Sequence, residues 1–279
     1  MPTRLPSHHV VPAHARGAGG RARNRMTASA EIIAEPDPRG STRLPVLRSQ
    51  VPLVLRRAAE AVYLVSAAAA PLGGDRLDLR IEVRAGATLC LRTVAASVAL
   101  PGLDGEESLL TVTATVAAGG RLDYLPEPVV VADGARHATD IRASVAEGGS
   151  LVLRDELILG RHGERGGAFR GSLRADYAGR PLLRQALDVS GSDAVTGGPA
   201  ILSGHRAVGT LLRVDPVLDE VPGVPPSPGA GPWISVMPLA AGPAILVTAL
   251  ANDALTLRRS LALGLAGPAE DRAPSRLRS

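Results

Sequence analysis

The sequence predicts a mainly β protein in which short strands stack in a β-helix-like arrangement, with one or two short helices near the C-terminus. Three observations support this. Apolar residues alternate or run together over short lengths between about residues 44 and 214, as is typical of strands. Turns that contain glycine separate these runs, and one turn pattern recurs. Long stretches with helical periodicity are missing from the same region.

The expected strands follow one another closely along the chain. The strongest apolar or alternating patterns lie at residues 62–65, 77–83, 88–93 and 111–116. The segment 221–232 is rich in Pro and Gly and is expected to be a surface loop. Two further strands are expected at 233–236 and 245–249. A short helix at 254–263 would be capped by Asn252 or Asp253 and ended by Gly264.

The recurring turn joins a valine to a leucine through a glycine corner. Its three copies begin at Val83, Val116 and Val145, and read VRAGATL, VAAGGRL and VAEGGSL. Glycine suits such corners because it reaches positive φ without a Cβ clash. Three copies at similar spacing indicate stacked β units, as in a β-helix. Three ordinary hairpins in a β-sandwich explain the repeat equally well.

Composition predicts one domain between two tails. The 279 residues are assigned as a disordered tail at 1–43, a single β domain at 44–266 and a second disordered tail at 267–279. Cys90 is the only cysteine, so no disulfide within the chain is possible, which fits a reducing cytoplasm. The sequence contains no run of 18 or more apolar residues, so no membrane-spanning helix is predicted.

The charge pattern excludes several function classes. The formal charge is +4, but residues 31–270 hold 23 Arg against 26 acidic residues, so the basic charge lies in the tails. With five aromatic residues, the body does not resemble a nucleic-acid-binding surface. All 31 basic residues are Arg. A Schiff-base lysine and a phosphate-binding P-loop lysine are therefore absent.

A charged cluster after residue 154 is the first candidate site. Paired carboxylates there suit general acid–base chemistry or a divalent cation, whereas carboxylates paired with the arginines would only stabilise a turn. Neighbouring residues of a strand point to opposite faces, so only one of Asp155 and Glu156 can face a common interior. The cluster consists of Asp155, Glu156, Arg161, His162, Glu164 and Arg165.

A second candidate is the turn Gly73-Gly74-Asp75. The two glycines permit a sharp turn before a strand, and an aspartate there commonly accepts hydrogen bonds from backbone amides of its own turn. A functional Asp75 would have to meet Glu164 in space. His137 and His205 are isolated and are expected to be hydrogen-bonded structural residues. No recognised catalytic motif is present, so the residues assemble no complete catalytic set.

These motifs resemble the urease accessory protein family UreD, also called UreH. The resemblance extends over about residues 62–187 and rests on the order of several short motifs. They are Gly73-Gly74-Asp75-Arg76-Leu77, the corner Leu125-Pro126-Glu127-Pro128, Gly134-Ala135-Arg136, and Glu156 followed by Gly160-Arg161 and Gly163-Glu164. The central tryptophan of the family is Tyr124 here, and the region beyond about residue 214 matches poorly.

The resemblance implies a β-helix-like scaffold rather than an enzyme. Proteins of this family bind UreF, which recruits the GTPase UreG, and contact apo-urease, and the assembly delivers nickel to the urease active site. Transient Ni²⁺ passage needs oxygen or imidazole ligands that hold the ion loosely. On this reading Asp75 and Glu164 are the first candidate ligands, followed by Glu156 and His162. The remaining motif residues, Gly73, Gly74, Leu125, Pro126, Gly160, Arg161 and Gly163, are expected to be structural.

Two other readings of the sequence remain open. One is a β-solenoid enzyme that hydrolyses carbohydrates through Asp155, Glu156 or Glu164. It calls for a groove lined by aromatic residues, and the chain has few of these. The other is a β-repeat module with a purely structural role.

Overall fold

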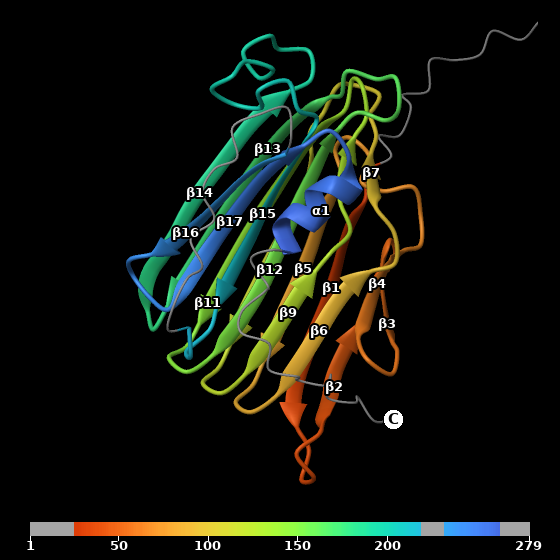
Figure 1. Cartoon of the computed structure of the whole chain (residues 1–279). Coiled ribbons are helices and arrows are strands. Elements are labelled where there is room, and N and C mark those ends of the chain that lie inside the picture. Colours follow the sequence, from red (N-terminus) through yellow and green to blue (C-terminus); the bar gives the residue numbers. More distant parts are fainter. Residues whose placement is uncertain (1–24, 219–231, 263–279) are drawn as a thin grey trace, which may run out of the picture.

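The computed structural model describes residues 25–218 and 232–262. This part of the chain contains 17 strands, which form two facing sheets, and one helix (Figure 1). The mainly β prediction is therefore confirmed. The predictions for the first 24 residues, for the loop at 221–231, for Gly264 and for the tail at 267–279 lie outside the described residues.

The first sheet has seven strands in the order β14-β13-β11-β8-β5-β1-β2. The five inner strands run parallel, and β2 and β14 close the edges as antiparallel partners. The strands are β1 (Thr27–Pro36), β2 (Thr42–Arg48), β5 (Arg76–Val83), β8 (Ser108–Val116), β11 (Arg136–Val145), β13 (Ala168–Tyr177) and β14 (Arg180–Ser190).

The second sheet has ten strands, with the main order β16-β17-β15-β12-β9-β6-β4-β3 and the short strands β7 and β10 continuing it beside β12. Its middle strands β4, β6, β9 and β12 are parallel. The strands are β3 (Leu53–Arg57), β4 (Val62–Ser66), β6 (Thr88–Thr93), β7 (Ser97–Ala99), β9 (Arg121–Leu125), β10 (Val129–Val131), β12 (Ser150–Leu159), β15 (Ala207–Val214), β16 (Trp233–Leu239) and β17 (Ala244–Ala251).

The chain alternates between the two sheets, and this decides between the two explanations of the repeat. It passes from β5 to β6, from β8 to β9 and from β11 to β12, so each glycine turn joins one sheet to the other. Successive copies then pair in parallel, β5 with β8 and β8 with β11. Hairpins would pair antiparallel within one sheet. The repeated unit is therefore one coil of a β-helix.

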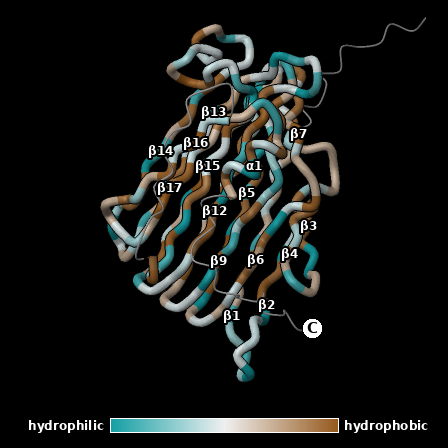
Figure 2. The backbone as a smooth tube through the Cα atoms, in the orientation of Figure 1, coloured by the Kyte–Doolittle hydropathy of each residue, from teal (hydrophilic) through white to brown (hydrophobic). Residues whose placement is uncertain are grey.

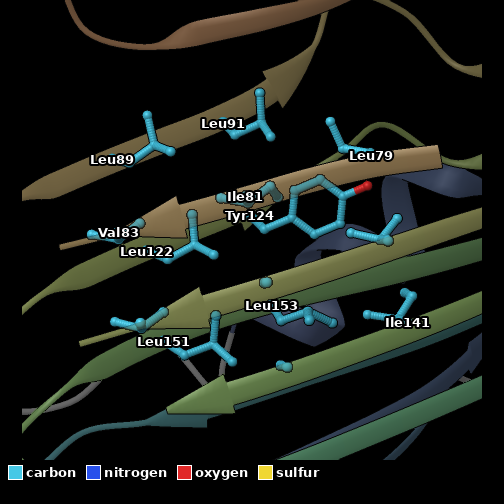
Figure 3. Close-up of a cluster of buried hydrophobic side chains, with 14 of the residues drawn as sticks. Leu79, Ile81, Val83, Leu89, Leu91, Leu122, Tyr124, Ile141, Leu151 and Leu153 are labelled. Atoms are coloured by element: carbon cyan, nitrogen blue, oxygen red, sulfur yellow. The ribbon is translucent and has the colours of Figure 1, made fainter. Parts of the chain in front are cut away.

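Each copy of the repeat adds one layer to the core. Val83, Val116 and Val145 stand in register on the first sheet. The leucines that end the three copies, Leu89, Leu122 and Leu151, stand in register on the second sheet (Figure 3). All six side chains are at most 2% exposed. Polar residues alternate with these along the strands (Figure 2), which gives each sheet one buried and one outer face.

The glycine corners themselves stack. Gly86, Gly119 and Gly148 have φ values of 76°, 67° and 77°, in the left-handed region that glycine enters most easily. The amide of Gly119 donates to the carbonyl of Gly148 over 3.1 Å, so the second and third corners are hydrogen-bonded to each other. The repeat signal in the sequence therefore records a real backbone requirement.

One part of the domain prediction is wrong. Residues 27–43 were assigned to the N-terminal tail, but β1 lies inside the first sheet between β2 and β5. Ala28, Ala30, Ile32 and Ala34 face the core and are at most 2% exposed. The small side chains of this strand weakened its apolar pattern in the sequence.

The helix α1 (Ala254–Ala262) lies against β15 and β17 on the outer face of the second sheet (Figure 1). Of the two predicted caps, Asp253 is the one used: its carboxylate accepts from the amide of Thr256 over 2.8 Å. Leu257 and Leu261 pack onto β15 at Gly209, where a Cβ would lie 2.7 Å from Leu261. Among the described residues, no helix has the length and apolar character needed to cross a membrane.

Candidate functional site

Asp75 is a buried residue that holds its own turn. Its side chain is 1% exposed. Oδ1 accepts from the amide of Met26 over 2.9 Å, and Oδ2 accepts from the amide of Leu72 over 2.8 Å. The carboxylate therefore ties the start of β1 to the turn before β5. This is the backbone-bonding role that the sequence offered as the alternative to a functional one.

We expect Asp75→Ala to lower the free energy of unfolding by about 2–4 kcal/mol, because two backbone amides would lose their buried acceptors. Urea denaturation followed by circular dichroism measures the change. Asp78→Ala is the matched control, because Asp78 lies on β5, three residues after Asp75, and pairs with the exposed Arg80. The control should change stability by less than 1 kcal/mol. Equal effects in the two variants would contradict the structural role of Asp75.

Glu164 closes the turn between β12 and β13. Its carboxylate accepts from the backbone amide of Arg161 over 2.9 Å, from that residue's guanidinium over 2.5 Å and from the amide of Asp133 over 3.2 Å. The hydrogen bonds from Arg161 lower the pKa of Glu164 to about 2. His162, in the same turn, is exposed. The predicted structural role of Arg161 in a turn is matched by these contacts.

Arg206 organises the same turn and was not found from the sequence. Its guanidinium donates to the carbonyl oxygens of Leu159, Arg161 and Glu164 over 2.8–2.9 Å, and more weakly to that of Gly160. It lies 42 residues or more away along the chain. No local pattern marks an arginine that serves distant carbonyl groups, so only the fold reveals it.

Glu156 is the buried member of a charge cluster between β12 and α1. Its side chain has no exposed surface. It lies 3.2 Å from Arg154 and 2.6 Å from Arg258 of α1. Arg258 also reaches both carboxylate oxygens of Glu127 at 2.8 Å. We name these four residues, Glu127, Arg154, Glu156 and Arg258, the helix clamp.

Asp155 points the other way, into a cavity between the sheets. The expectation that Asp155 and Glu156 face opposite sides is confirmed. The cavity has a volume of about 270 Å³, enough for several water molecules. Its walls are mainly apolar, and its polar lining includes Asp155, His137, Thr139, Tyr124 and Glu127. Within the described part of the chain, Asp155 makes no hydrogen bond or ion pair.

Burial sets the charge state of the cavity. Desolvation, and secondarily the nearby charge of Glu156, raises the pKa of Asp155 to about 6. Desolvation lowers the pKa of His137 to about 4, so this histidine is neutral at neutral pH. His137 contacts the hydroxyl of Ser108 at 2.9 Å. It is thus a hydrogen-bonded structural residue, as the sequence predicted, that also lines the cavity.

We expect Asp155→Asn to stabilise the protein above pH 6. The folded-state pKa of about 6 lies above the ordinary value of 3.8, so this carboxyl contributes stability at low pH that is lost as pH rises through that interval. The variant should gain roughly 1–3 kcal/mol over the wild type at pH 7.5, and little at pH 4. Urea denaturation at the two pH values measures this.

The matched control for this pH experiment is Asp140→Asn. Asp140 lies on the outer face of β11, where hydrogen bonds from Ser172 and Arg142 lower its pKa despite partial desolvation. The pKa shift of Asp140 is therefore opposite in sign to that of Asp155, and the Asp140→Asn variant should gain no stability at pH 7.5. A gain in both variants would show that the effect does not come from burial of Asp155.

The structure places the predicted nickel ligands Asp75, Glu156 and Glu164 in three separate regions, with His162 in the turn of Glu164. Asp75 precedes β5 and Glu164 precedes β13, and two strands lie between β5 and β13, which places these strands about 14 Å apart. Glu156 faces α1, on the outer face of the second sheet. In the part of the chain that the structure describes, no group of three or more His, Cys, Asp or Glu side chains is arranged to hold a metal ion. Their role in nickel passage stays a prediction.

The three carboxylates of the carbohydrate reading also lie in three different places. Asp155 faces the cavity, Glu156 faces the helix clamp, and Glu164 is bound within its turn. A glycosidase needs two carboxyl groups flanking one bond. These three residues do not form such a pair.

Comparisons with known proteins give matches over most of the chain. The family model described as UreD urease accessory protein matches residues 26–273. "Urease accessory protein UreD 3" of Streptomyces griseus is 46% identical over 245 residues, which cover 85% of this chain and 94% of that protein. "Urease accessory protein UreD" of Frankia alni is 43% identical, over 86% of this chain and 92% of that protein.

The matched region reaches further than the motifs found in the sequence. It includes β1 and extends through β15, β16, β17 and α1, where the motif resemblance was weak. The alignments with the two relatives cover 85% and 86% of this chain. The chain therefore belongs to the UreD family of urease accessory proteins.

Proposed function

We propose that this chain acts in urease maturation as a protein scaffold rather than as an enzyme. The observation that carries the proposal is the family match over residues 26–273, which includes nearly all of the described β domain. Its relatives are named as urease accessory proteins, not as catalytic subunits. In this role the chain binds UreF, recruits UreG through UreF, contacts apo-urease, and works in the cytoplasm.

The proposed cargo of the assembly is Ni²⁺, which the scaffold helps to deliver to the urease active site. A path for this ion needs water and weakly held oxygen ligands, because closed sites with many ligands trap a metal ion. The cavity between the sheets supports such a path, since the carboxylate of Asp155 lies there without a partner among the described residues.

A second unpaired oxygen atom lies near Asp155 in the interior. Gln185 Oε1 is buried without a hydrogen-bond partner among the described residues, and its Nε2 lies 3.5 Å from Thr210. Thr210 is the strand neighbour of Asp155. Asp155 and Gln185 therefore join the candidate ligands predicted from the sequence, which are Asp75, Glu164, Glu156 and His162. Unlike those, Asp155 and Gln185 have acceptor oxygen atoms without a partner among the described residues.

The experiment is activation of urease in cells that express the urease subunits and the other accessory proteins, with and without this chain. We expect urease activity and its nickel content to fall to background without it. Pull-down with UreF and with the urease subunits tests the contacts separately. Full activation in the absence of the chain would overturn the proposal.

The nickel path is tested with substitutions that preserve the fold. We expect Asp155→Asn and Gln185→Leu to lower the nickel content of urease while leaving UreF binding intact. Asp75→Ala and Glu164→Ala test the ligands predicted from the sequence, and the Asp75 variant is interpretable only if its unfolding midpoint shows a folded chain. Unchanged nickel loading in Asp155→Asn would exclude the cavity as the path, and unchanged loading in Gln185→Leu would exclude the Gln185 amide as a ligand.

A further inference from the structure

We propose that Arg258 of α1 is a switch that controls cation entry to the cavity, and that withdrawing α1 opens a divalent-cation site between Glu127 and Asp155. This inference rests on the proposed function, because it assigns a regulation to the nickel path. It connects three observations: the helix clamp, the cavity opening and the packing of α1 on the sheet.

The first observation is that one guanidinium group satisfies two carboxylates. Arg258 holds Glu127 through two contacts of 2.8 Å and Glu156 through one of 2.6 Å. Arg154 lies 3.2 Å from Glu156 and 3.8 Å from Glu127. Arg154 also donates to the carbonyl of Pro126 over 2.8 Å, which fixes it to the corner between β9 and β10. Arg258 is the one member of the clamp that lies on the helix, whereas the other three lie on β12 or in the corner between β9 and β10.

The second observation is that the clamp and the cavity share a residue. Glu127 lines the cavity and its side chain is 33% exposed, so it lies where the cavity meets solvent. Inside, the enclosed carboxylate of Asp155 has no partner among the described residues. A carboxylate in a mainly apolar cavity without a partner among the described residues favours a cation, and the path to it passes the residue that Arg258 holds.

The net charge becomes more negative when the helix is withdrawn. With Arg258 bound, the two carboxylates and two guanidinium groups of the clamp sum to zero, and the ionised carboxylate of Asp155 brings the region to −1. Without Arg258 the clamp sums to −1 and the region to −2. Glu127 then has free oxygen atoms at the cavity opening. Oxygen ligands with water completing the shell suit a hard or borderline divalent cation that must also leave again.

The third observation is that few side chains of α1 pack against the sheet. It is nine residues long, and its buried side chains are Leu257, Ser260 and Leu261. Leu255 on the same helix is 59% exposed. A partner protein that covers Leu255 therefore contacts the element that carries Arg258. Docking at α1 and cation entry are in this way coupled through one side chain.

The test measures Ni²⁺ binding to the full-length chain by isothermal titration calorimetry. All variants carry His8→Ala, His9→Ala and His14→Ala, so that the histidines of the N-terminal segment do not bind the ion. We expect Arg258→Gln to bind Ni²⁺ about tenfold more tightly than the parent chain, since it removes one positive charge close to the site. Circular dichroism and the unfolding midpoint confirm that each variant is folded.

Four further variants make the result specific. Adding Asp155→Asn or Glu127→Gln to Arg258→Gln should abolish the gain. Arg142→Gln is the matched control, because Arg142 pairs with Asp140 on the outer face of the other sheet, and it should leave affinity unchanged. Leu257→Ala with Leu261→Ala loosens the helix while keeping Arg258, and should reproduce part of the gain.

Several outcomes would overturn the switch. An unchanged affinity in Arg258→Gln excludes it, and a gain that survives Asp155→Asn places the ion elsewhere. A gain in Arg258→Gln without any gain in the loosened-helix variant excludes coupling through α1. These measurements need no urease: if the switch fails while loss of the chain still prevents urease activation, the scaffold proposal stands alone.

Discussion

Replacing Glu156 by Ala is expected to lower the free energy of unfolding by about 3–4 kcal/mol. The carboxylate has no exposed surface and lies within 3.2 Å of both Arg154 and Arg258. Removing one partner of a buried ion pair leaves the others without their compensating charge, which costs far more than losing an exposed pair. Urea denaturation at pH 7.5 measures the loss.

The control for Glu156 is Glu31→Ala. Glu31 pairs with Arg48 over 2.9 Å, but the two side chains are 34% and 76% exposed, so this pair should contribute less than 1 kcal/mol. Glu156→Gln keeps the shape and hydrogen-bonding oxygen and should lose less stability than Glu156→Ala. If Glu156→Ala costs no more than the control, the clamp does not hold α1 to the sheet.

Replacing Gly167 by Ala is expected to cost about 3 kcal/mol or more. A Cβ at this position would lie 2.2 Å from the carbonyl oxygen of Ala135 and 2.6 Å from that of Ala132. Both are backbone atoms of the preceding coil, and they cannot move without shifting the hydrogen bonds between coils. The thermal unfolding midpoint should fall by about 6–12 °C for a domain of this size.

Gly163→Ala is the matched control for the effect of backbone conformation alone. Gly163 lies in the same turn with a φ of 80°, and a Cβ there meets no atom within 4 Å. The cost should therefore be about 1 kcal/mol, that of a non-glycine residue in the left-handed region. A larger loss in Gly163→Ala than in Gly167→Ala would show that φ, rather than the close approach of two coils, governs this turn.

Much of the fold could be predicted from the sequence because the repeat lies in residues that are close together along the chain. Each coil of the β-helix repeats the same valine, glycine corner and leucine, and the spacing survives in the sequence at residues 83, 116 and 145. The direction of pairing was not readable. A strand, a turn and a strand look the same in a hairpin and in a coil, and only the position of the next copy distinguishes parallel from antiparallel pairing.

The candidate site was readable only in part. Alternation along β12 showed that Asp155 and Glu156 face opposite sides, since side chains of a strand alternate. It did not show which of them would be buried with arginines and which would face a cavity. That depends on Arg258, 102 residues further along the chain from Glu156, and on the walls that other strands contribute.

The sequence by itself determined the strand content, the glycine corners, the helix cap at Asp253 and the family, because each depends on residues close together or on motifs in a set order. The tertiary structure decided the place of β1, the support of the Glu164 turn by Arg206, and the joining of Glu127 and Glu156 by Arg258. The physical reason is that stacking the coils brings together polar groups from distant strands, and their partners follow from the register of the coils rather than from neighbouring residues.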